Sequence, residues 1–105
     1  MPYSVYTSEN FDREMNKLSK DEQDRIQKIF LQLKENPYVG DQLRYKFLRE
    51  KRLDEKRIYW LVYDELLAVL VVAISGKKTQ KETIDYIVRY LEEFKLYLKE
   101  KLMKD

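Results

Sequence analysis

Four cations stand where the strands predicted for the second half of this chain begin or end: Arg52, Arg57, Lys77 and Lys78. An arginine guanidinium can hold two phosphate oxygens at once and keeps its charge at every physiological pH. A lysine whose pKa is lowered by neighbouring cations can act as a base. Because the strands are expected to be adjacent, we predict that the four side chains converge on one phosphate group.

Neither histidine nor cysteine occurs among the 105 residues. The absence of histidine excludes the commonest general base and the commonest metal ligand. The absence of cysteine excludes disulfides and thiolate metal sites, and it fits a reducing compartment. Any chemistry must therefore use lysine, arginine, tyrosine or carboxylate side chains, and we predict no metal site and no cofactor.

Positive charge is concentrated in the middle of the chain, although the net charge is only +2. Residues 1–35 contain six basic and seven acidic side chains, whereas residues 44–57 contain seven basic and three acidic ones. Lys77, Lys78 and Lys81 form a second basic group. Such local concentration indicates a phosphate-rich partner. The alternative is an ordinary solvated surface, on which the arginines pair with nearby carboxylates and the lysines belong to an exposed loop.

The composition is that of a globular protein with a highly charged surface, since 44% of the residues are hydrophobic and 38% are charged. The length fits a single domain over residues 1–105. The longest apolar stretch, residues 66–74, is far shorter than the roughly 20 residues that span a bilayer. No targeting segment is visible. We therefore expect a soluble cytoplasmic protein without a membrane partner.

The first part of the chain predicts a strand and then a helical hairpin. Residues 3–7 are aromatic and β-branched, as in a strand, and Ser8 can cap the helix that follows. Ser19 and Glu22 form a capping box for a second helix, which must end at Asn36-Pro37 because the residue before proline avoids the helical region.

Residues 48–53, 57–63 and 66–74 predict three antiparallel strands separated by short turns. The third is apolar at every position, so we expect it to be covered on both faces. Leu48 and Leu53 would point to opposite faces of the first strand, which a bulge there would explain.

Thr79 and Glu82 predict a capping box for a long C-terminal helix with one apolar stripe. The predicted fold class is therefore α+β. An N-terminal strand and helical hairpin pack on a small antiparallel sheet, and a long C-terminal helix follows.

Three short motifs in this order of elements match a known family. Asn36–Gly40 closes the hairpin, and residues 48–53 followed by 57–60 are similar to a strand pair of the form L-x-E-L-R … Y-R-h-h-Y, where h is hydrophobic. Lys-Lys-Thr-Gln-Lys at 77–81 follows an apolar strand. Together they resemble the RelE/ParE superfamily of bacterial and archaeal toxins, and the pentad resembles its phage-derived HigB-like branch. The chain departs from the family at Lys51, which replaces a leucine, and it lacks the family's His-Arg or terminal Arg-Tyr pair.

The resemblance implies a RelE-like fold and the toxin of a type II toxin–antitoxin system, neutralised by a cognate antitoxin. Many relatives are metal-independent mRNA endonucleases that act with the ribosome and repress translation, so this is the first hypothesis. The second is a ParE-like toxin that inhibits gyrase without catalysis. The third is a degenerate member that binds only antitoxin or RNA.

Metal-free RNA cleavage must deprotonate the 2′-hydroxyl, stabilise the phosphorane and protonate the 5′-oxygen. The residues predicted to be catalytic are Arg52, Arg57, Lys77 and Lys78. The residues predicted to bind RNA are Lys46, Arg49, Lys51 and Lys81. The oligomeric state stays open, and the C-terminal helix can offer its stripe to an antitoxin or to a second copy.

Overall fold

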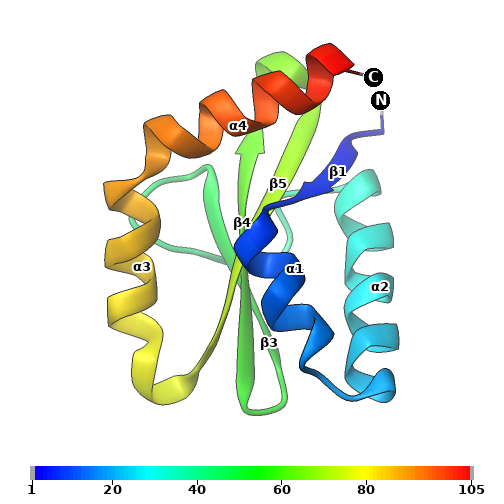
Figure 1. The fold of residues 1–105 in the computed structure, drawn as a ribbon, viewed down its shortest axis with the longest axis vertical. Helices are drawn as coiled ribbons and strands as arrows, with labels where there is room; N and C mark the ends of the chain where they lie inside the picture. The colour runs from blue at the N-terminus through cyan, green and yellow to red at the C-terminus, as the bar shows by residue number, and fades with distance from the viewer. Residues whose placement is uncertain (1, 105) are drawn as a thin grey trace.

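The computed structural model describes residues 2–104, which form a mixed five-stranded sheet with helices on both faces (Figure 1). The strands are β1 (Ser4–Thr7), β2 (Asp41–Gln42), β3 (Leu48–Leu53), β4 (Lys56–Tyr63) and β5 (Ala68–Gly76). The helices are α1 (Glu9–Asn16), α2 (Lys20–Glu35), α3 (Gln80–Arg89) and α4 (Leu91–Lys104), with short 3₁₀ turns η1 (Asp64–Leu66) and η2 (Lys77–Thr79).

The predicted α+β class is confirmed, and the sheet is larger than the three strands expected. Its order is β1-β5-β4-β3-β2, with β1 parallel to β5 and the other neighbours antiparallel. The chain passes through α1 and α2 between β1 and the rest of the sheet, and this crossover allows a parallel pair. Strand β2 is only two residues long, too short for a periodic signal in the sequence.

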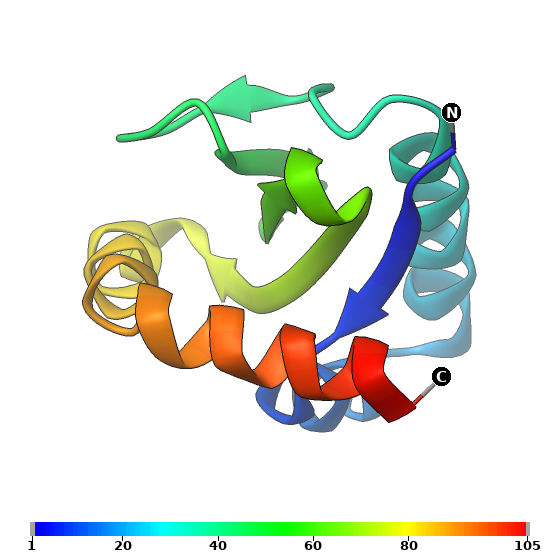
Figure 2. The same cartoon turned by 90° about the horizontal axis from the view of Figure 1, so that it is seen from above.

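Each face of the sheet has its own hydrophobic core. On the first face, Phe11 of α1 and Ile26 and Leu33 of α2 pack against alternate residues of β4 and β5. On the second face, α3 and α4 contribute Ile87, Phe94 and Leu98. Figure 2 shows the sheet between these two layers. Residues 58–63 of β4 and 68–74 of β5 are therefore apolar on both sides, as the sequence predicted for β5.

The bulge lies in a different strand from the one expected. Leu48 and Leu53 do point to opposite faces of β3, but both are buried because both faces are covered, so β3 needs no bulge. The irregularity is between β4 and β5, where Tyr59 pairs with Ala73 and its neighbour Trp60 pairs with Val71. Val72 is left out of the pairing between β4 and β5. After it, the side chains of β5 point to the opposite face from the one that regular alternation would give.

Two predictions for the C-terminal region are wrong. The single long helix is two helices, because the chain leaves helical geometry at Tyr90 (φ −109°, ψ 24°). This break turns α4 across the end of the sheet, where Phe94 and Leu98 reach the second core (Figure 1). Thr79 forms no capping box, since it continues the η2 turn into α3 and its hydroxyl donates to the Gly76 carbonyl instead.

The helical hairpin begins and ends where the sequence predicted. The Ser8 Oγ accepts from the Phe11 N–H at 3.2 Å, and the Ser19–Glu22 capping box is present. Among residues 2–104, no helix combines the length and the apolar character that crossing a membrane requires.

The turn after α2 is anchored by Trp60 and by a close approach at Gly40. The fully buried Trp60 indole donates to the Pro37 carbonyl at 2.8 Å. Gly40 has φ +80°, and a Cβ built on it would lie 2.3 Å from the Glu50 carbonyl oxygen. Only glycine combines that backbone conformation with that clearance.

We expect Gly40→Ala to lower the free energy of unfolding by at least about 2 kcal/mol, because it adds both left-handed strain and a backbone clash. Gly76→Ala is the matched control, since its φ is −85° and nothing lies within 4 Å of its added Cβ. Urea unfolding should show the control unchanged or more stable by up to about 1 kcal/mol. Equal stability of the two variants would contradict the account.

Candidate functional site

Arg52 and Arg57 face each other across the β3–β4 hairpin. They are direct partners in the antiparallel register, so both side chains leave the same face of the sheet, with Cβ atoms about 4.5–5.5 Å apart. Tyr59 lies two residues along β4 and belongs to the second core, which places both arginines on the face covered by α3. The sequence expectation of adjacent strands is confirmed here, and we call this place the Arg57 site.

Arg57 is a largely buried arginine whose guanidinium forms no hydrogen bond with residues 2–104. Its side chain is 11% exposed, and its Nε lies 4.0 Å from the Oε1 atom of Glu50. Within residues 2–104 that Nε has no hydrogen-bond partner. The charge is thus partly compensated by a carboxylate. The Nε itself is enclosed, so an anion would have to bind the terminal guanidinium nitrogens, which form no hydrogen bond with residues 2–104.

Glu50 is the acidic member of the site and lies between Leu48 and Arg52 on the same side of β3. Its side chain is 5% exposed, and its Oε1 accepts a 2.7 Å hydrogen bond from the Gln80 amide nitrogen. Gln80 is the first residue of α3, so this bond connects the middle of β3 to the start of that helix.

Tyr59 and Ser75 complete the floor of the Arg57 site. Their hydroxyl oxygens are 2.8 Å apart, and Ser75 also donates to the Gly76 carbonyl. Ser75 pairs with Arg57 and shares its face only because the bulge at Val72 exchanges the faces of β5. Burial raises the pKa of the Tyr59 hydroxyl, so Tyr59 stays neutral at physiological pH.

The predicted lysines lie next to this floor. Lys77 and Lys78 occupy η2, directly after Gly76, which is the register partner of Lys56. Lys81 is in the first turn of α3. All three are exposed and form no ion pair with residues 2–104. The chain therefore brings the lysine segment to the same end of the sheet as the two arginines.

The other predicted RNA-binding residues lie elsewhere. Arg49 and Lys51 pair with Trp60 and Ile58, so they point to the first face. Arg49 donates to the Tyr38 carbonyl at 2.6 Å and to the Gly40 carbonyl at 3.2 Å.

Lys46 lies near the same region, with its Nζ 5.4 Å from the centre of the Tyr38 ring. The eight predicted residues are thus divided between the two faces of the hairpin. Arg49 has a structural use there, because it fixes the turn that follows α2.

Sequence reasoning missed three members of the site: Glu50, Ser75 and Gln80. Glu50 was considered only as a surface partner for an arginine, although it alternates with Leu48 and Arg52 and so shares their face. No signal identified Ser75, since its face depends on a bulge inside a uniformly apolar strand. Among residues 2–104, no group of three or more acidic side chains is placed to hold a metal ion.

Solved structures resemble this chain over most of its length. A double mutant of the Escherichia coli toxin RelE in the free state matches with a TM-score of 0.72 and 20% identity, over 85% of this chain and 98% of that one. The chain has the RelE fold. The Mycobacterium tuberculosis toxin–antitoxin complex RelBE2 matches with a TM-score of 0.64 and 21% identity, over 73% of this chain and 100% of that one.

An archaeal RelE–RelB complex from Pyrococcus horikoshii matches with a TM-score of 0.62 and 18% identity, over 73% of this chain and 97% of that one. No protein-family model matches the chain, and no curated protein is similar enough in sequence to count as a relative. The RelE fold predicted from the sequence motifs is therefore confirmed, and the likeness of residues 77–81 to the HigB-like branch stays a prediction.

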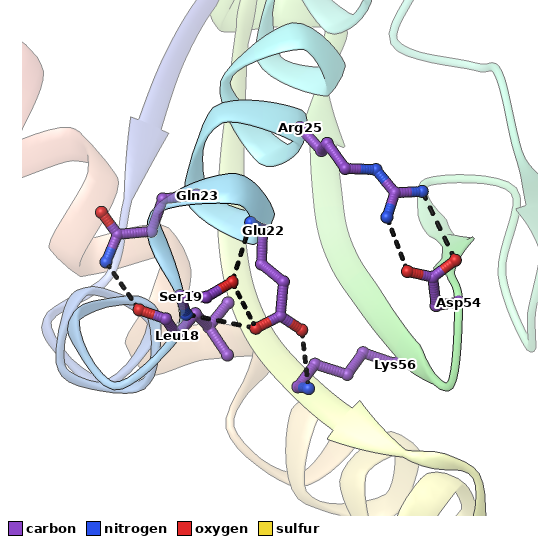
Figure 3. Close-up of polar contacts among 7 residues, drawn as sticks. All are labelled: Leu18, Ser19, Glu22, Gln23, Arg25, Asp54 and Lys56. Carbon is purple, nitrogen blue, oxygen red and sulfur yellow. Dashed lines mark hydrogen bonds and ion pairs between the residues drawn. The ribbon is translucent and has the colours of Figure 1, made fainter.

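Two ion pairs hold the hairpin that carries the Arg57 site against α2 (Figure 3). The Lys56 ammonium donates to Glu22 at 2.8 Å, and the Arg25 guanidinium donates to Asp54 at 2.6 Å. The hydrogen bond from Lys56 lowers the pKa of Glu22, and the one from Arg25 lowers the pKa of Asp54. Asp54 stands in the turn between Arg52 and Arg57, with φ +54°.

These lowered pKa values predict how stability depends on pH. A carboxyl whose pKa is lower in the folded state stabilises the fold fully above its unfolded pKa, near 4, and loses that effect as pH falls through the folded value. We expect the double variant Glu22→Gln and Asp54→Asn to melt at a lower temperature than the wild type at pH 7.

The same double variant should change less between pH 5 and pH 2, as measured by melting temperature across that range. Glu35→Gln, an exposed residue at the end of α2, is the control. A variant with the same slope as the wild type below pH 4 would contradict the assignment.

Proposed function

We propose that this chain is the toxin of a type II toxin–antitoxin system and cleaves mRNA on the ribosome, in the cytoplasm, without a metal ion. The RelE fold supports the toxin assignment, because its solved neighbours include toxins bound to their antitoxins. The observation that best supports cleavage is the Arg57 site, where two arginines in register leave one face and the Nε of Arg57 is buried without a hydrogen-bond partner.

In the proposed reaction, the 2′-hydroxyl attacks the adjacent phosphorus and the bond to the 5′-oxygen breaks, giving a 2′,3′-cyclic phosphate and a 5′-hydroxyl. Arg57 and Arg52 hold the oxygens of the phosphorane, where negative charge develops. Lys77 and Lys78 are assigned the proton transfers, one accepting from the 2′-hydroxyl and the other donating to the 5′-oxygen. Tyr59 has no such role, because it is fully buried.

The remaining cations are assigned to the RNA backbone. Lys81 lies one helical turn from η2 and can contact the next phosphate. Lys46, Arg49 and Lys51 lie on the other side of the hairpin, so they can bind only an RNA that crosses the sheet edge formed by β2. Arg49 is the weakest of these candidates, because its guanidinium already donates to three backbone carbonyls.

A cognate antitoxin is the proposed protein partner. Helix α4 is its proposed contact, since Leu96 is 61% exposed and Met103 is 87% exposed on the outer side of that helix. The same residues are the proposed contact if the chain dimerises. The two lie seven residues apart, which places them on one side of the helix.

Binding without cleavage is the second candidate, and the composition favours it. The chain contains no histidine, so every proton transfer depends on lysine. A toxin of this kind would still use the basic surface to hold its target, and a growth effect without mRNA cleavage would identify it.

The test is expression of the chain alone in a bacterial host, with mRNA ends mapped across the transcriptome. We expect growth arrest and new 5′-hydroxyl ends for the wild type. Arg52→Ala and Arg57→Lys should each lower the cleavage rate of a defined RNA by about 10²-fold, because each removes a forked donor from the phosphorane.

Lys28→Ala is the control, since it removes one positive charge from the exposed side of α2. Arg52 is exposed, so its variant keeps the fold and the result for it does not depend on stability. Full activity of both arginine variants would overturn the cleavage proposal.

A further inference from the structure

Burying a carboxylate beside a hydrophobic core is costly unless the group is paired, and Glu50 is buried in just such a place. It is 4% exposed, and the neighbours on its face, Leu48 and Tyr59, are fully buried members of the second core. An apolar residue would serve that packing equally well. The two polar partners of Glu50 therefore need an explanation, and both belong to the Arg57 site.

The first partner is Arg57, which lies close enough to Glu50 for electrostatic attraction but too far away for a hydrogen bond. The Arg25 guanidinium donates to the Asp54 carboxylate at 2.6 Å, and the Arg49 guanidinium donates to the Tyr38 carbonyl at 2.6 Å. Both of these arginines therefore already have close hydrogen-bond partners. The Nε of Arg57 is 4.0 Å from Glu50, beyond hydrogen-bond distance. Glu50 thus lowers the cost of burying the Arg57 charge and leaves the terminal guanidinium nitrogens of Arg57 free for a phosphate.

The second partner is Gln80, the fourth residue of the Lys-Lys-Thr-Gln-Lys pentad. Its amide donates to Glu50 at 2.7 Å, and no side chain caps the start of α3. The ion pair between Arg44 and Asp85 holds the same helix one turn further on. The bond from Gln80 is therefore the contact that ties the lysine segment to the strand carrying Arg52.

We propose that Glu50 is a positioning residue of the Arg57 site. One carboxylate orients the buried guanidinium of Arg57 and, through Gln80, fixes Lys77, Lys78 and Lys81 beside it. This inference rests on the proposed function, because it assigns Glu50 a part in holding the RNA phosphate. It also explains why a glutamine stands among the lysines of residues 77–81: Gln80 fixes the position of the lysines through its hydrogen bond to Glu50.

The test compares Glu50→Gln, which keeps the shape and the bond to Gln80 but removes the charge, with Gln80→Ala, which removes the anchor and keeps the carboxylate. Glu35→Gln and Gln32→Ala, both exposed on α2, are the matched controls. For Glu50→Gln we expect kcat for a defined RNA to fall by about 10- to 100-fold with KM unchanged or lower, because the guanidinium loses its orientation but not its charge.

For Gln80→Ala we expect KM to rise, with a smaller loss of kcat and a weaker dependence of binding on salt, because the lysines are displaced from the phosphates. A purely structural role for Glu50 would lower the melting temperature and leave kcat per folded molecule unchanged, and that result would overturn the proposal.

A second measurement does not depend on RNA cleavage. The Arg57 Nε–Hε signal in NMR spectra should shift when inorganic phosphate is added to the wild-type protein, and Glu50→Gln should move that signal before any phosphate is added. If the wild type does not cleave RNA but both shifts occur, the proposed function fails and the positioning role of Glu50 stands. If neither shift occurs, the positioning role fails as well.

Discussion

The arrangement of this molecule depends on a sheet that is covered by helices on both faces. Side chains on both faces of β4 and β5 are then buried. A charged residue in these strands must therefore pair with another polar group or lie where its side chain can reach solvent. Arg57 lies at the end of the sheet near the β3–β4 turn, with Glu50 beside it. The proposed chemistry is therefore placed at one end of one face.

Two arginines of the hairpin, each with a buried Nε, show how strand parity gives neighbouring cations different surroundings. Arg49 and Arg57 each have a buried Nε without a hydrogen-bond partner, but they lie on opposite faces. Arg49 uses its other nitrogens to hold the turn at Tyr38 and Gly40, whereas Arg57 has only the attraction of a carboxylate. Arg49 thus holds a turn of the fold, whereas Arg57 is the arginine that we propose binds an anion.

Much of the fold could be predicted from local signals, because the caps at Ser8 and Ser19 and the stop at Pro37 are short-range chemistry. The sequence predicted that Arg52 and Arg57 lie on adjacent antiparallel strands, but it did not give their register. Strand β4 begins at Lys56, one residue earlier than expected, and this pairs Arg52 directly with Arg57. What could not be predicted depends on contacts distant in sequence. The bulge at Val72 lies in a run of apolar residues, 68–74, in which no polar side chain marks the solvent-facing positions. The face on which Ser75 lies could therefore not be predicted. The helix break at Tyr90 depends on the packing of Phe94 and Leu98 in the second core. The role of Gln80 depends on its hydrogen bond to Glu50, which lies 30 residues away in the sequence.

The most direct test of the central claim, that the second face at this end of the sheet holds an RNA phosphate, is an NMR titration with a single-stranded RNA whose 2′-hydroxyls are methylated to prevent cleavage. The Nε–Hε signals of Arg57 and Arg49 report the two faces within one sample. We predict that the Arg57 signal shifts in a saturable manner and by more than the Arg49 signal. A shift of Arg49 alone, or no shift of Arg57 at saturating RNA, would contradict the claim.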